Sequence, residues 1–143
     1  MLDHCGHWQY AWSPDGRKLV AHSKGVISVI SIPGGKSEPI LDLKREGLID
    51  DAWGLCWLPD GKRIGFISQR EIEKPPRIYL VPAGGGKVTE LAADADDHKE
   101  LLYPSPDGKW ISYDSAGYVK TRPEGSIWEV NLADLLQKVR VRP

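Results

Sequence analysis

The stretch AWSPDGRKLVAHS, residues 11–23, is repeated in outline by LCWLPDGKRIGFIS at 55–68 and by LYPSPDGKWISYDS at 102–115. Pro-Asp-Gly suits a tight turn, because proline presets φ at the second turn position, aspartate tolerates the third, and glycine supplies positive φ at the exit. An aromatic residue precedes each turn, and β-branched or aromatic residues follow it. Each stretch therefore predicts a β-hairpin.

The three turns recur at a nearly constant interval. Pro14, Pro59 and Pro106 are 45 and 47 residues apart, and Trp12 and Trp57 keep the 45-residue offset. A period of about 40 to 50 residues is the length of one four-stranded propeller blade and is too long for ankyrin-type or leucine-rich units. The spacing therefore predicts an all-β chain of three four-stranded blades.

The remainder of each unit fits this interpretation. Third strands are expected at 26–32, 77–81 and 126–132, and Gly-rich turns lead to fourth strands at 39–43 and 88–91. The third unit departs from the pattern, because residues 133–137 favour a helix before a short strand at 138–142. We expect a single propeller domain, 1–143, with blades at about 7–47, 52–93 and 98–142.

These residues resemble a known family. The motifs Trp-Ser-Pro-Asp-Gly-Arg at 12–17, Trp-Leu-Pro-Asp-Gly-Lys at 57–62 and Ser-Pro-Asp-Gly-Lys at 105–109 are similar to the signature of TolB-like β-propeller repeats, which are WD-like blades of many bacterial proteins. The resemblance covers essentially the whole chain and implies the propeller fold. It names no activity, because the family includes accessory proteins, ligand-binding modules and non-catalytic domains of peptidases.

Composition restricts the classes of partner. The chain has 143 residues, a formal net charge of −1, no apolar run long enough to cross a bilayer and no RNA-binding signature, so neither membrane nor nucleic acid is expected. The first ten residues lack the basic start and apolar core of a signal peptide, which predicts a cytoplasmic protein. Many relatives are periplasmic, and removal of a signal peptide would place this chain there too. Cys5 and Cys56 are expected to be free thiols.

We predict no catalytic residue. The chain lacks the Gly-x-Ser-x-Gly elbow of the hydrolases that accompany some propellers. The run Gly-Gly-Gly-Lys at 84–87 lacks the rest of the phosphate-loop pattern and is interpreted as a hairpin turn. His4, Cys5 and His7 lie close together, but their spacing matches no structural zinc site, and an ordinary polar loop is favoured.

The segments that precede the first strand of each unit carry carboxylates and imidazoles. In a propeller these loops gather around the central channel on one face, as do the loops 69–76 and 114–125. Such a ring could hold a divalent cation or a cationic ligand, although polar loops in which aspartate favours turns explain the same residues. The candidate channel-face residues are Asp3, His4, His7, Asp50, Asp51, Asp96, Asp97, His98 and, on the long loop, Tyr118.

The tryptophans have two interpretations, a ligand-stacking surface or blade-to-blade packing. Most fall at repeat-equivalent strand positions, so packing is favoured, and Trp12 and Trp57 are expected to be buried at equivalent places. The full set is Trp8, Trp12, Trp53, Trp57, Trp110 and Trp128.

Two classes of function remain. The favoured one is a non-enzymatic module that binds a protein, a peptide or a small ligand at the channel face. The alternative is a metal-assisted lyase or hydrolase with an Asp and His site at the channel mouth. Three blades cannot close a ring, since closed propellers have about 4 to 8. We therefore expect a homodimer of six blades joined through blades one and three, or else a fragment of a longer propeller.

Overall fold

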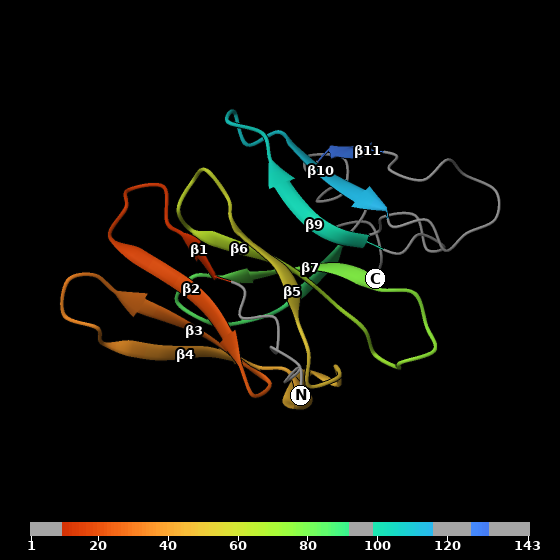
Figure 1. Cartoon of the computed structure of the whole chain (residues 1–143), viewed down its shortest axis with the longest axis horizontal. Coiled ribbons are helices and arrows are strands. Elements are labelled where there is room, and N and C mark those ends of the chain that lie inside the picture. Colours follow the sequence, from red (N-terminus) through yellow and green to blue (C-terminus); the bar gives the residue numbers. More distant parts are fainter. Residues whose placement is uncertain (1–9, 92–98, 116–126, 132–143) are drawn as a thin grey trace, which may run out of the picture.

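Figure 1 shows the computed structural model, which describes residues 10–91, 99–115 and 127–131. Its strands form three antiparallel sheets in chain order. The first contains β1 (Tyr10–Trp12), β2 (Lys18–Ser23), β3 (Val26–Ser31) and β4 (Ser37–Asp42). The second contains β5 (Trp53–Trp57), β6 (Arg63–Ser68), β7 (Arg77–Pro82) and β8 (Thr89–Leu91). The third contains β9 (Lys99–Pro104), β10 (Trp110–Ser115) and β11 (Ile127–Asn131).

The expected all-β fold is confirmed. Within the described residues the one helical element is a 3-10 turn, η1 (Lys44–Glu46). The predicted third and fourth strands are present in the first two sheets, with ends that differ by one or two residues. Two expectations for the third unit, the helical stretch at 133–137 and the strand at 138–142, lie outside the described residues.

The Pro-Asp-Gly turns hold themselves together through the aspartate. The carboxylate of Asp15 accepts from the hydroxyl of Ser13 over 2.6 Å and from the backbone N–H of Arg17 over 3.0 Å. Asp107 accepts from Ser105 and from the N–H of Lys109 over 2.6 and 3.0 Å. The glycines that close the three turns have φ between 67° and 70°. The local sequence thus determines each hairpin without help from the neighbouring sheets.

The sheets pack face to face around their inner strands. β1 contacts β5, and β5 contacts β9, which brings the first strand of every unit to the inside (Figure 1). Side chains alternate along each strand, so the second sheet supplies two cores. Ile64 and Phe66 of β6 belong to the core shared with the first sheet, whereas Ile67 belongs to the core shared with the third.

The tryptophans do not share one environment. Trp57 is buried at 7% exposure, but Trp12 is 53% exposed, so the expectation of equal burial is wrong for Trp12. The two side chains differ in burial because Trp57 packs against the first sheet, whereas Trp12 lies on the face of the first sheet that no described sheet covers. Trp110 is exposed and Trp53 is half-buried. Trp8 and the side chain of Trp128 are not among the parts that the structure describes.

Candidate functional site

The structure describes two of the predicted channel-face residues, Asp50 and Asp51, on the loop that joins the first two sheets. Both are exposed. Asp50 pairs with Lys44, its Oδ2 lying 2.7 Å from Nζ, and Asp51 places Oδ1 at 3.9 Å from Nδ1 of His22. The other candidates lie outside the described residues, and for them the channel-face site stays a prediction: Asp3, His4, His7, Asp96, Asp97, His98 and Tyr118.

His22, which lies on β2 beside these carboxylates, is not among the residues predicted from the sequence. It is 8% exposed, and its Nε2 has no hydrogen-bond partner among the described residues. Burial lowers the pKa of His22 below its usual value, although the carboxylates of Asp51 and Asp50 act in the opposite direction. One signal could have identified it, because His22 shares the inward register of Val20 and so places an imidazole on a core-facing position.

The loop that follows β6 lies beside the inter-sheet loop, as expected for one face of a propeller. The N–H of Ile49 donates to the carbonyl of Gln69 over 2.9 Å, and Nη1 of Arg70 donates to the carbonyl of Glu46 over 3.3 Å. Beneath them is a pocket of about 50 Å³, against which the buried Tyr79 lies. Its hydroxyl has no partner among the described residues, and the pocket has room for a water molecule.

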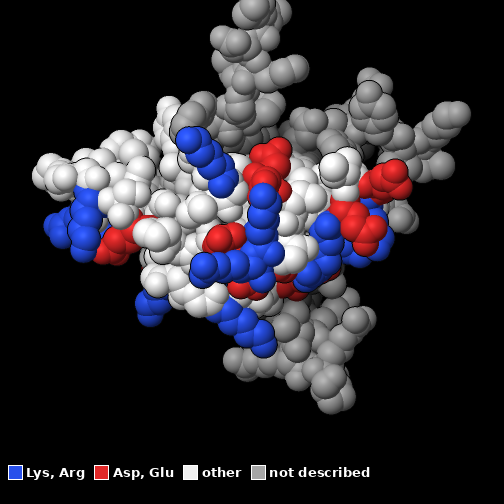
Figure 2. Space-filling view, turned by 90° about the horizontal axis from the view of Figure 1, so that it is seen from below, with Lys and Arg blue, Asp and Glu red and all other residues white. Residues whose placement is uncertain are grey.

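Charged side chains are interspersed rather than segregated. Figure 2 shows basic and acidic groups next to one another on the face seen from below. Several form exposed pairs, such as Lys36 with Glu38 and Arg45 with Asp42. Among the described residues no three His, Cys, Asp or Glu side chains gather where they could hold a metal ion. The part of the chain that the structure describes also contains no helix long and apolar enough to cross a membrane.

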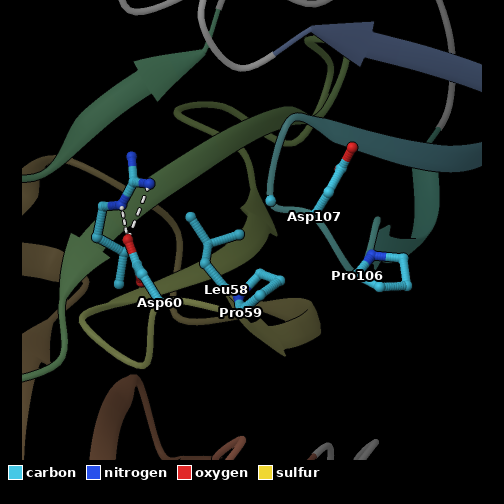
Figure 3. A pocket seen from close by; sticks show the side chains of 7 residues that line it. Leu58, Pro59, Asp60, Pro106 and Asp107 are labelled. Atoms are coloured by element: carbon cyan, nitrogen blue, oxygen red, sulfur yellow. Dashed lines mark hydrogen bonds and ion pairs between the residues drawn. The ribbon is translucent and has the colours of Figure 1, made fainter.

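A shallow pocket of about 340 Å³ lies between the Pro-Asp-Gly turns of the second and third sheets (Figure 3). Both of its carboxylates are engaged in their own turns. Burial acts to raise the pKa of Asp60, but the N–H of Lys62 and the guanidinium of Arg63 outweigh it and hold the pKa below its usual value. The Ser105 hydroxyl, followed by the N–H of Lys109, lowers the pKa of Asp107. These groups stabilise the turns and form no acid and base pair.

Cys56 is the one cysteine within the described residues, and it is a free, buried thiol. Its burial raises the pKa to about 12. At neutral pH the thiol is therefore protonated and is not a nucleophile. Cys5 lies outside the described residues.

Apolar surface is concentrated on the outer faces of the first and third sheets. By the alternation of side chains along β1, Tyr10 and Trp12 lie on the face of the first sheet that turns away from the second. On the third sheet, Leu102 and Ile111 are buried against the second sheet. The residues next to them along β9 and β10 therefore lie on the opposite face of the sheet. Six large hydrophobic side chains among the described residues are exposed, and all but Ile72 lie on these two faces: Tyr10, Trp12, Leu101, Tyr103, Trp110 and Ile72.

Comparison with known proteins agrees with this geometry. No family model matches the chain. The Uncharacterized protein Atu1656 of Agrobacterium fabrum is 29% identical over 102 residues, which are 71% of this chain and 33% of that protein. The chain thus spans about a third of the length of this relative.

Solved structures have the same arrangement of sheets. TolB from Acinetobacter baumannii superposes with a TM-score of 0.69 at 23% identity, covering 89% of this chain and 30% of TolB. Hydrazine synthase of Kuenenia stuttgartiensis gives 0.64 at 19% identity, covering 94% and 42%. An oligogalacturonate lyase in complex with manganese gives 0.63 at 13% identity, covering 83% and 31%.

The packed antiparallel sheets belong to the β-propeller class. Within that class, the chain has the fold of the TolB-like propellers, as its repeated motif implied. Likeness of fold does not transfer an activity, because accessory proteins and enzymes both use this scaffold.

Proposed function

We propose that the chain is a non-enzymatic TolB-like binding or scaffolding module, and that two copies assemble into a six-bladed ring. One observation carries the proposal. Five of the six exposed large hydrophobic side chains among the described residues lie on the two outer sheet faces, which are the faces that a neighbouring blade covers in a propeller. Exposed apolar patches of this kind mark interaction surfaces.

The simplest closed arrangement places the third blade of each copy on the first blade of the other. Both contacts are then head to tail, and a twofold axis along the channel closes the ring after two copies. Six blades fall within the usual range of about 4 to 8, whereas three copies would give nine. The blades would comprise residues of about 7–47, 52–93 and 98–142.

The proposed binding surface is the face that carries the inter-sheet loops. Asp50 and Asp51 lie there next to the loop 69–76, and a dimer would present two copies of each. A protein, a peptide or a small cationic ligand fits this surface, because its described carboxylates are exposed. The alternative, a metal-assisted lyase or hydrolase, would depend on the Asp and His residues of the channel face, most of which lie outside the described residues.

Light scattering coupled to size-exclusion chromatography tests the assembly. The chain has a mass of 15.9 kDa, and we expect a folded species of about twice that mass at micromolar concentration. A folded species near 15.9 kDa would contradict the dimer. Aggregation or partial unfolding would also contradict it, and would favour the rival account in which further blades of a longer chain cover these faces.

A further inference from the structure

The seam between the first and second sheets contains a hydrogen bond from one inner strand to the other. The indole Nε1 of Trp57, on β5, donates to the backbone carbonyl of Ala11, on β1, over 3.1 Å. Because Trp57 is buried, an unpaired N–H at this position would destabilise the fold. Trp57 therefore needs a carbonyl on the inner strand of the preceding sheet.

Trp12 occupies the same position in the first sheet, 45 residues earlier. It lies opposite Leu19 in the hairpin, as Trp57 lies opposite Ile64, and these partners are also 45 residues apart. The shared register directs the indole of Trp12 toward the outer face of the first sheet, where it is exposed.

The residues around Trp12 are equivalents of a buried surface. In the second sheet, the residues that surround Trp57 are all buried against the first sheet: Leu55, Ile64, Phe66 and Val81. By register, their equivalents in the first sheet are Tyr10, Leu19, Ala21 and Ile30, of which none is fully buried. The residues on the outer face of the first sheet thus match, position by position, those that form a blade-to-blade contact in the second sheet. Among the described residues, however, no sheet covers this face.

The third sheet presents the complementary acceptor. Ser13 and Ser105 anchor their turns through the same pair of bonds, which makes Tyr103 the equivalent of Ala11. The carbonyl of Tyr103 accepts from the hydroxyl of Ser112 over 3.2 Å, and that hydroxyl oxygen can itself accept a bond. The Tyr103 ring is 53% exposed on the face opposite to the second sheet and adds an aromatic surface for an indole.

From this equivalence we propose that Trp12 is the directional anchor of the contact between two copies, its indole N–H donating to the Tyr103 carbonyl and Ser112 hydroxyl of the second copy. This rests on the proposed assembly and specifies its chemistry. The occupant is the third sheet of a second copy, because that sheet exposes both the apolar side chains and the acceptor that this contact requires. In the ring each copy would donate one such bond and accept another.

Substitution of Trp12 tests the anchor. Trp12→Phe keeps an aromatic ring and removes the N–H, so the dissociation constant of the dimer, measured by analytical ultracentrifugation, should rise about tenfold per bond, or about a hundredfold for two seams. Trp12→Lys places a charge on the face and should yield a folded monomer at every concentration tested. Ile72→Ala is the matched control, because Ile72 is 81% exposed and lies off both faces, and it should leave the constant unchanged.

Hydrogen exchange of the indole N–H, followed by NMR, supplies a second readout. The Trp57 signal should be protected at all concentrations, and the Trp12 signal only in the dimer; Trp57→Phe and Trp12→Phe assign the two signals. A dimer that tolerates Trp12→Phe, or whose Trp12 indole exchanges freely, would overturn the anchor and leave the proposed assembly standing. A folded wild-type monomer would overturn both.

Discussion

The outer face of the first sheet and the equivalent face of the second sheet share a register and differ in burial. Trp12 and Trp57 occupy one repeat position, yet the first is exposed and the second is buried with its N–H bonded to Ala11. Around them, Ala21 of the first sheet replaces the buried Phe66 of the second. The comparison shows that a repeat position determines where a side chain points, whereas its burial depends on whether another sheet covers it.

A second difference lies in how the two described seams fill the same space. In the first sheet Ala11 lies opposite Val20, and in the second sheet Cys56 lies opposite Gly65. The larger residue has moved from β2 to the inner strand β5. A Cβ added at Gly65 would lie 2.9 Å from Sγ of Cys56, so the two residues share one volume. At this repeat position the larger side chain therefore lies on β2 in the first sheet and on β5 in the second.

Of the substitutions that test this comparison, Phe66→Ala should lower the free energy of unfolding the most. Phe66 is fully buried and stacks on Tyr79 with ring centroids 5.5 Å apart. Its truncation leaves a cavity in the first seam, and we expect a loss of about 3–5 kcal/mol in the free energy of unfolding, measured by urea denaturation. The reciprocal change, Ala21→Phe, adds a ring to the outer face of the first sheet; in the background of the monomeric Trp12→Lys variant, where that face is uncovered, it should alter the free energy of unfolding by less than about 0.5 kcal/mol. Similar losses for both variants would contradict the assigned faces.

Gly65→Ala should have a smaller effect, through overpacking. The added methyl group would clash with the Cys56 thiol, and we expect a loss of about 1–3 kcal/mol in the free energy of unfolding. Combining it with Cys56→Ala should recover part of that loss, because the first sheet accommodates Val20 opposite Ala11. A double-mutant cycle measures the coupling. Independent, additive effects of the two substitutions would show that the residues do not share one volume.

Protonation of His22 in acid should lower the free energy of unfolding by less than either substitution above. Burial depresses its pKa in the folded state, so the folded chain resists a proton that the unfolded chain accepts near pH 6.5. The stabilisation is present above that pH and is lost as pH falls below it. In the unmodified chain the urea midpoint should fall between about pH 8 and pH 5, and His22→Gln should make it depend less on pH over this range. If the variant shows the same pH dependence as the unmodified chain, groups other than His22 cause it.

The turn carboxylates titrate in a separate range. The pKa values of Asp15, Asp60 and Asp107 are held below 3.8, chiefly by hydrogen bonds within their own turns, so they stay ionised while His22 titrates. Their contribution is lost only in stronger acid. The two ranges can therefore be distinguished in one pH series.

The candidate site was less predictable than the fold. Asp50 and Asp51 could be placed on an inter-sheet loop from the repeat alone, because they precede the first strand of the second unit. Their partners could not, since Lys44 and His22 reach them from a 3-10 turn and from the end of β2. These contacts join different elements, and no local pattern encodes them. For Asp96, Asp97, His98 and Tyr118 the site remains a prediction.

The sequence by itself determined the hairpins, their period and their register, because each Pro-Asp-Gly turn is closed by bonds within a few residues and each strand alternates its side chains. Tertiary structure alone decided which of those faces are buried. Trp12 and Trp57 carry the same local signals, and only the presence of the first sheet beside the second distinguishes them. Burial is a property of two surfaces in contact, and a local motif specifies one of them.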